Sequence, residues 1–209
     1  MDRKGILLVV SGFSGAGKGT LMKELVGRYD NYALSISATT RSPREGEVDG
    51  REYFFRTKEE FEQMIADEAL IEHACYVGNY YGTPRAYVEE QLTLGRDVIL
   101  EIEIQGALQI KKRFPDTLLL FVSTPDAETL KNRLIGRGTE SLDVVEKRLS
   151  RASEEAEGIE NYDYFIINDD LDTCVTQVHQ IIQGEHSRVS RNLELINTIK
   201  KDISKFQKG

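Results

Sequence analysis

An apolar run that breaks into a glycine-rich loop constrains this chain more than any other feature. Residues 6 to 20 read ILLVVSGFSGAGKGT, in which Gly12 and Gly17-Lys18 have the spacing of a phosphate-binding loop, or P-loop. Successive backbone N–H groups of such a loop wrap a polyphosphate, and the lysine reaches its terminal phosphates. Ile6–Val10 is expected to be a buried strand, and Thr20–Tyr29 a helix whose positive end faces the anion. The chain is therefore predicted to bind a nucleoside triphosphate rather than to form a chance glycine turn.

One position departs from the usual loop. The residue after the lysine is commonly Ser or Thr, whose hydroxyl meets magnesium, but here it is Gly19, and Thr20 follows. We therefore expect magnesium to be held by water, by nucleotide oxygens and indirectly by Glu101, with Thr20 left to meet a phosphate.

Composition restricts the class of protein. The 209 residues are 40% hydrophobic and 30% charged, which is ordinary for one globular core with insertions. A formal net charge of −8 argues against general binding to nucleic acid. Cys75 and Cys174 form neither a disulfide framework nor a metal-ligand pattern. The first residues lead straight into the first expected strand, which is unlike a secretory signal, and no apolar run approaches the roughly 20 residues that a membrane span needs. We therefore expect a cytoplasmic protein without nucleic-acid or membrane partners.

Continuous hydrophobic segments alternate with helical ones. Strands covered on both faces are expected at Ile6–Val10, Val98–Ile104, Leu118–Val122 and Tyr164–Ile167. Helices are expected at Thr20–Tyr29, Arg85–Leu94, Pro125–Ile135, Leu142–Gly158 and Thr173–Gly184. This alternation predicts an α/β fold with a central, mostly parallel sheet.

Two regions do not follow this alternation of strands and helices, and we interpret them as insertions. Residues 35–84 are polar and turn-rich, and residues 125–160 are helical and rich in arginine. An enzyme that joins two nucleotides needs a pocket for each and a cover that excludes water, which these insertions could supply. The tail, residues 185–209, is expected to form a helix that lies on the domain or on a second subunit.

The first insertion carries polar groups suited to a nucleotide. Arg41 and Arg44 lie on either side of Pro43 in an extended turn, and two guanidinium groups in a fixed turn suit one phosphate. Ser35 and Ser37 are expected on one face of an alternating strand that runs from residue 32 to residue 38.

Glu72 offers a way to distinguish bases. It is expected to end an amphipathic helix, where it could be only a solvated residue. One carboxylate can also accept both adjacent N–H donors of guanine, whereas adenine presents an acceptor at N1. When the wrong base binds such a site, buried polar groups are left without hydrogen-bond partners, which weakens binding.

Two further groups of charged residues point to phosphoryl transfer. Glu101 and Glu103 are expected on one face of a strand at its carboxyl end, where α/β sheets bind ligands. Unpaired acids are costly there, so a cation or substrate is expected nearby. Arg133, Arg137 and Arg148 are expected to stabilise transferring phosphates.

Together these segments resemble the bacterial guanylate kinase family over about residues 4 to 184. The motifs that carry the resemblance are SGFSGAGKGT, SATTRSPREGE, EYFF, GNYYGTP, LEIEIQG, RLIGRGTE and FIINDD. The resemblance implies a three-layer α/β sandwich of the P-loop type and transfer of the ATP γ-phosphate to GMP, with magnesium. Its implied parts are a core at 4–34, 85–124 and 161–184, a GMP-binding region at 35–84, a lid at 125–160 and a C-terminal helical extension at 185–209.

The resemblance also implies site residues, position by position. The implied ATP contacts are Gly12, Phe13, Ser14, Gly15, Ala16, Gly17, Lys18, Gly19, Thr20 and Asn168. The implied GMP contacts are Ser37, Arg41, Arg44, Tyr53, Glu72, Tyr81, Thr83 and Glu103. The implied catalytic residues are Lys18, Arg41, Arg133, Arg137 and Arg148. Glu101 and Glu103 stand where many family members carry aspartates.

Two alternatives stay open beside this interpretation. A kinase for another nucleoside monophosphate would share the P-loop and the lid but should lack Glu72 together with TTRSPR and GNYYGT. A scaffold domain would keep the GMP region and typically lose P-loop or lid residues. Because Lys18 and the lid arginines are present, we favour an enzyme; the sequence leaves monomer or homo-oligomer undecided.

Overall fold

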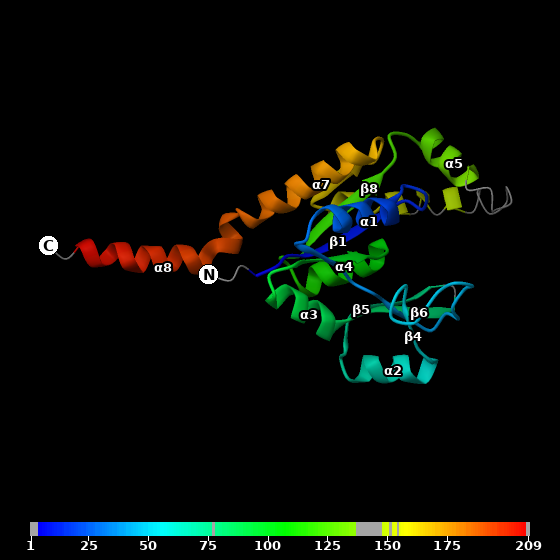
Figure 1. Cartoon of the computed structure of the whole chain (residues 1–209), viewed down its shortest axis with the longest axis horizontal. Coiled ribbons are helices and arrows are strands. Elements are labelled where there is room, and N and C mark those ends of the chain that lie inside the picture. The colour runs from blue at the N-terminus through cyan, green and yellow to red at the C-terminus, as the bar shows by residue number, and fades with distance from the viewer. Residues whose placement is uncertain (1–3, 77, 137–147, 151, 154, 208–209) are drawn as a thin grey trace.

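A five-stranded parallel sheet forms the centre of the protein (Figure 1). The computed structural model describes residues 4–76, 78–136, 148–150, 152–153 and 155–207. The strand order is β2 (Tyr32–Leu34), β7 (Asp97–Glu101), β1 (Leu7–Gly12), β8 (Leu118–Ser123) and β9 (Tyr164–Ile167). Every neighbouring pair is parallel, which confirms the α/β fold class.

Helices cover both faces of this sheet because successive side chains of its strands point to opposite sides. Leu8 and Val10 face α1 (Lys18–Arg28) and α7 (Leu171–His186), whereas Val9 faces α3 (Arg85–Thr93) and α4 (Ile104–Arg113). These side chains are fully buried. The three layers agree with the continuous hydrophobicity of the predicted strands.

Most predicted elements are present, with one correction at β7. The predicted strand from Val98 to Ile104 ends at Glu101, because the chain turns at once into α4, which was not predicted. Helix α5 (Ala127–Ile135) and the short 3-10 helix η1 (Ile159–Asn161) complete this part of the chain. The predicted helix from Leu142 to Gly158 falls partly outside the described residues; residues 148–150 are helical.

A second sheet of four strands belongs to the first insertion. Its order is β4 (Phe54–Phe55), β3 (Ala38–Thr39), β6 (Asn79–Pro84) and β5 (Leu70–Tyr76), and β6 is antiparallel to both neighbours. Helix α2 (Lys58–Ala66) begins with a capping box and packs Phe61 against this sheet. The strand expected from residue 32 to residue 38 is therefore wrong, because the chain leaves one sheet at Leu34 and enters the other at Ala38.

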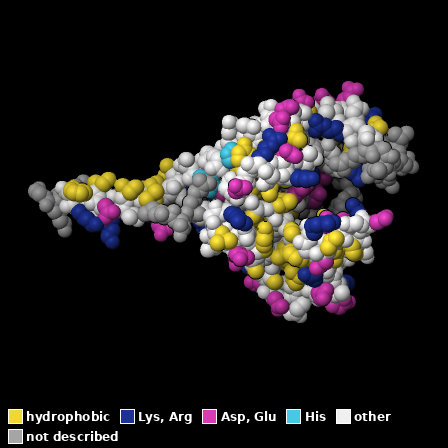
Figure 2. All heavy atoms as spheres, viewed as in Figure 1, with side chains coloured by type: hydrophobic (Ala, Val, Ile, Leu, Met, Phe, Trp, Pro, Cys, Tyr) yellow, Lys and Arg dark blue, Asp and Glu magenta, His cyan; other side chains and the backbone are white. Residues whose placement is uncertain are grey.

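The C-terminal tail extends away from both sheets (Figure 1). It comprises η2 (Val189–Asn192), α8 (Leu193–Ser204) and η3 (Lys205–Gln207). Helix α8 buries none of its side chains, and Figure 2 shows a hydrophobic stripe along it. The tail is helical as predicted; its first part contacts the domain through Arg191 and the Asp116 carbonyl at 2.7 Å, whereas α8 does not pack on the described domain. Among the described residues, no helix is both long and apolar enough to cross a membrane.

A buried aspartate joins three segments at the end of the sheet where β7 begins. Asp97 is fully buried, and its Oδ1 accepts the Ile6 backbone N–H at 2.8 Å. Its Oδ2 accepts the Asn31 Nδ2 group at 3.2 Å, and His186 Nε2 lies 2.8 Å from Oδ1. The carboxylate thus connects the start of β1, the segment before β2 and the end of α7.

We expect Asp97→Ala to lower the free energy of unfolding by about 3 kcal/mol, because it leaves buried donors without an acceptor. Urea unfolding measures this change. The matched control is Glu24→Ala, which removes an exposed i,i+4 pair with Arg28 and should cost about 0.5 kcal/mol or less. Equal losses for the two variants would contradict the structural role of Asp97.

Candidate active site

The carboxyl ends of the parallel strands gather most of the predicted donor-site residues on one edge of the main sheet. The glycine-rich loop follows β1, Glu101 ends β7, and Asn168 follows β9. Open α/β sheets bind their ligands at this edge. The fold therefore brings together residues that are far apart in the sequence, from the glycine-rich loop to Glu101 and Asn168.

Two glycines let the loop take its shape. Gly12 has φ 153°, and a Cβ there would lie 2.0 Å from the Val122 carbonyl oxygen of β8. Gly17 has φ 89°, in the left-handed region, and a Cβ there would lie 2.6 Å from Asn168 Nδ2. Helix α1 begins directly afterwards at Lys18. The loop therefore leads into a helix N-terminus, which favours an anion.

The lysine is held over this loop by backbone oxygens. Lys18 Nζ donates to the Gly12 carbonyl at 2.7 Å and to the Phe13 carbonyl at 3.3 Å. Glu101 lies beside the loop, since a Cβ on Gly19 would be 3.8 Å from Glu101 Oε2. Burial raises the pKa of Glu101, the Lys18 charge lowers it, and Glu103 raises it further.

Three more predicted residues meet the loop from its other sides. Asn168 is buried, and its Nδ2 donates to the Ala16 carbonyl at 2.8 Å. Arg133 of α5 reaches the same carbonyl at 3.5 Å, and Arg148 donates to Ser14 Oγ at 3.1 Å. Arg137 lies outside the described residues. Two predicted lid arginines therefore already contact the phosphate loop.

Glu72 lies in a different element from the one predicted. It belongs to β5 and not to a helix end, because α2 ends at Ala66. Both Glu72 and its neighbour Thr83 of β6 are buried, and the Thr83 hydroxyl donates to Glu72 Oε1 at 2.7 Å. Burial raises the pKa of Glu72, and the bond from Thr83 opposes that rise.

Gly106 leaves room for the second oxygen of this carboxylate. A Cβ on Gly106, in the first turns of α4, would lie 3.2 Å from Glu72 Oε2. A side chain larger than glycine at position 106 would therefore press on this carboxylate oxygen. The pair of Glu72 and Thr83 is therefore a buried acceptor next to the main sheet.

A second cluster of predicted residues surrounds one guanidinium group. Arg41 lies over the Tyr53 ring, with 5.3 Å from its Cζ atom to the ring centre. The rings of Tyr53 and Tyr81 are edge-to-face with centres 6.1 Å apart. Burial raises the pKa of Tyr53. Arg44 is exposed at the next turn of the chain, and Ser37 is partly buried at the start of the second sheet.

The expected shared strand face of Glu101 and Glu103 is wrong. Glu101 is the last residue of β7, whereas Glu103 is the N-cap residue of α4, with extended backbone. Alternate side chains share a face only while the strand continues, and β7 ends between Glu101 and Glu103. Burial also raises the pKa of Tyr162 to about 12, with smaller effects from Ser11, Glu103 and Glu155.

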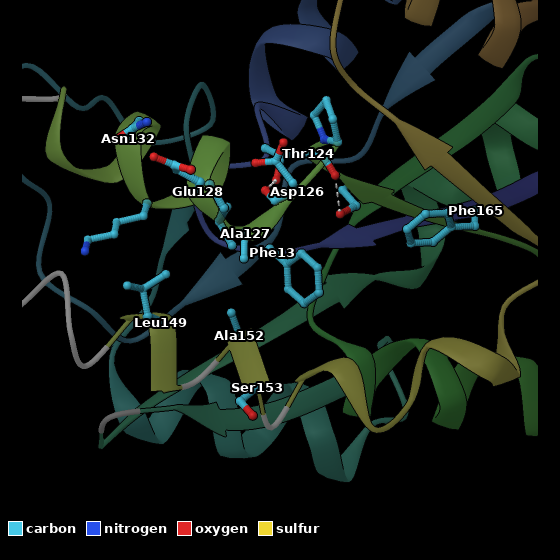
Figure 3. Close-up of a pocket in the computed structure, with 14 residues that line it drawn as sticks. Phe13, Thr124, Asp126, Ala127, Glu128, Asn132, Leu149, Ala152, Ser153 and Phe165 are labelled. Atoms are coloured by element: carbon cyan, nitrogen blue, oxygen red, sulfur yellow. Dashed lines mark hydrogen bonds between the residues drawn. The ribbon is translucent and has the colours of Figure 1, made fainter.

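A cavity of about 770 Å³ adjoins the phosphate loop (Figure 3). Phe13, Ala127, Leu149 and Ala152 point toward it from the loop, from α5 and from the helical segment beyond residue 147. The cavity lining includes neither Lys18 nor the predicted GMP residues. It is therefore separate from the charged groups of the candidate site.

Sequence reasoning missed Glu47 as a separate functional candidate, although it is the last residue of the quoted motif SATTRSPREGE. Its carboxylate accepts two hydrogen bonds from Arg41 Nη2, at 3.0 and 2.9 Å. The signal in the sequence was an acid six residues after an arginine, which is too common to be specific. The described residues contain no cluster of three acidic, His or Cys side chains that could hold a metal.

Comparisons with known proteins agree on one family. The family model named guanylate kinase matches residues 4–185. A guanylate kinase from Bacillus anthracis is 53% identical over 191 residues, 91% of this chain and 93% of the relative. One from Lactococcus lactis is 48% identical over 194 residues, 93% of this chain and 95% of the relative. A solved guanylate kinase from Anaplasma phagocytophilum has a TM-score of 0.73 at 30% identity, covering 90% of this chain and 89% of that one.

The loop geometry predicts opposite effects for two neighbouring glycines. Gly17→Ala should lower the free energy of unfolding by about 1 kcal/mol or more, because a Cβ is strained at its positive φ and meets Asn168. Gly19→Ala should leave it unchanged or raise it by about 0.5 to 1 kcal/mol, because Gly19 is helical and its Cβ would meet nothing closer than 3.8 Å. Urea unfolding of both variants checks this. A larger loss at Gly19 than at Gly17 would contradict the loop geometry.

Proposed function

The chain belongs to the guanylate kinase family and transfers the γ-phosphate of ATP to GMP, and we propose how its residues divide this reaction. The observation that carries the proposal is the buried pair of Glu72 and Thr83, an acceptor suited to guanine. It lies in the insertion, whereas the phosphate loop lies in the main sheet. One part of the chain thus takes the acceptor and the other takes the donor.

The donor phosphates are held by the loop from Gly12 to Thr20. Lys18 exchanges its bonds to the Gly12 and Phe13 carbonyls for oxygens of the transferring phosphate. Arg133 and Arg148 add positive charge from the lid side, together with Arg137 outside the described residues. Phosphoryl transfer depends mainly on positioning and charge stabilisation, which these groups supply. Asn168 supports the loop beside the adenine.

The acceptor nucleotide is recognised at both of its ends. The guanine N1–H and 2-amino groups donate to the Glu72 carboxylate, while Thr83 and Ser37 contact the base edge. Arg41 and Arg44 bind the GMP phosphate, with Tyr53 and Tyr81 donating from the other side. Glu103 contacts the same nucleotide from the start of α4. The cation–π contact between Arg41 and Tyr53 supports this grouping.

Magnesium accompanies ATP in this proposal. Mg²⁺ usually keeps several waters and binds one or two carboxylates together with substrate phosphates. The residues here suit such coordination, because one carboxylate, Glu101, lies beside Gly19 and Lys18 at the edge of the phosphate loop. Bound magnesium would neutralise developing negative charge on the phosphates. We place the reaction in the cytoplasm, with ATP and GMP as the partners of the protein.

The purified protein should phosphorylate GMP far better than AMP, CMP or UMP. The wrong base would leave two polar groups of the site without hydrogen-bond partners, which predicts a preference for GMP of about 100-fold or more in kcat/KM. A coupled assay of ADP release with the four monophosphates measures it. The nearly isosteric control Glu72→Gln should lose most of the preference for GMP over AMP. Equal rates with GMP and AMP in the unmodified protein would contradict base reading by Glu72.

Binding of GMP should release a proton from Glu72. The raised pKa keeps more of this carboxyl protonated in the free protein, whereas the guanine donors require the ionised form. Affinity for GMP should therefore rise as the pH rises through that pKa, and the free protein should lose stability over the same interval. Calorimetric titration in two buffers of different ionisation enthalpy counts the protons.

The GMP phosphate also titrates, so the comparison with Glu72→Gln isolates the carboxyl. The variant should release fewer protons on GMP binding than the unmodified protein does at the same pH, because only the contribution of the phosphate remains. Identical proton release in the two proteins would contradict the assignment.

A further inference from the structure

One carboxylate holds the guanidinium group of Arg41 in place. Glu47 Oε1 and Oε2 accept from Arg41 Nη2 at 3.0 and 2.9 Å. Both side chains are mostly buried, with 16% of Arg41 and 17% of Glu47 exposed. This pair is therefore better shielded from solvent than the exposed ion pairs that contribute little to stability.

Glu47 is itself fixed by the backbone of the same turn. Its Oε2 accepts the Arg44 backbone N–H at 2.7 Å, and its own N–H donates to the Arg44 carbonyl at 3.1 Å. The bond from Arg44 and the interaction with Arg41 lower the pKa of Glu47, against an opposing effect of burial. The carboxylate is therefore ionised at neutral pH and anchored from two directions.

Arg41 keeps donors for a further anion. A guanidinium group has five N–H donors. Within the described residues, Nη2 donates to both oxygens of the Glu47 carboxylate, and Nη1 donates to the Ser42 carbonyl at 2.7 Å. The other N–H groups of Arg41 remain as donors for an anion. Stacking over Tyr53 and Phe55 fixes the plane in which they lie.

We propose that Glu47 is a positioning residue for GMP, which orders the Arg41 guanidinium before the acceptor phosphate binds. The proposal rests on the assignment of Arg41 to that phosphate. A long arginine side chain loses rotamer freedom when it is immobilised, and Glu47 imposes that loss in the free protein. GMP then binds without ordering Arg41 itself.

The opposite role for Glu47 makes an opposite prediction. A carboxylate that merely occupied the phosphate position would compete with GMP, and its removal would lower KM for GMP. The bond to the Arg44 N–H favours positioning, because it ties Glu47 into the turn independently of Arg41.

The test is Glu47→Gln, with Glu52→Gln as the matched control. Glu52 has the same pattern one turn later, accepting the Val48 N–H at 2.8 Å and Arg51 Nε at 2.6 Å, but these partners are not among the proposed GMP residues. Glu47→Gln should raise KM for GMP about five- to tenfold with little change in kcat or in KM for ATP. Glu52→Gln should change none of these values.

Guanosine separates positioning of the phosphate from general damage to the pocket. It has the base and no phosphate, so its inhibition constant should be the same in Glu47→Gln and in the unmodified protein. Parallel losses for guanosine and GMP would overturn the proposal, and so would a lowered or unchanged KM for GMP.

Measurements in the Arg41→Ala background separate the positioning role of Glu47 from the assignment of Arg41 to the GMP phosphate. Glu47→Gln should have no further effect on KM for GMP once Arg41 is absent, because it acts through that side chain. A full additional effect in the double variant would overturn the positioning role. If Arg41→Ala alone leaves KM for GMP unchanged, the assignment of Arg41 to the phosphate fails instead.

Discussion

Parallel pairing of β1 between β7 and β8 is the constraint on which the rest of the site depends. The register sets Val10 beside Glu101 and Gly12 beside Val122, so the strands end at one edge. Gly12 can follow β8 this closely only because it lacks a side chain. The phosphate loop, its lysine and the acid at the end of β7 are therefore positioned by backbone hydrogen bonds.

The acceptor site depends on a different kind of constraint. Glu72 is a carboxylate in the buried part of a small sheet, where an unpaired charge is costly. Thr83 donates to one oxygen of Glu72, and the other oxygen lies next to Gly106, where a Cβ would come within 3.2 Å of it. The second sheet thus holds a group that is poorly satisfied alone and well satisfied by guanine. Specificity on this account comes from that difference.

The sequence predicted the parts of the fold whose signals are local. For the phosphate loop and β9, prediction and structure agree. Their signals, the glycine spacing and a continuous apolar run, can be recognised without knowing which distant residues they contact. Glu72 was assigned to the wrong element because only pairing with β6 makes residues 70–76 a strand. Helix α4 was missed and Glu103 was misplaced because the segment LEIEIQG alternates like a strand up to Gly106. Gly106 is needed for a contact that the sequence does not show, since a Cβ there would lie 3.2 Å from Glu72 Oε2. Contacts such as Arg41 with Glu47 arise only when the turn closes.

A crystal structure with GMP, a non-hydrolysable ATP analogue and magnesium would test the central claim most directly. Guanine N1 and its 2-amino group should lie within hydrogen-bond distance of Glu72, and the GMP phosphate should lie on Arg41. Lys18 should leave the Gly12 and Phe13 carbonyls and contact the terminal phosphate. A base bound away from Glu72, or a Lys18 that keeps both carbonyl bonds, would contradict it.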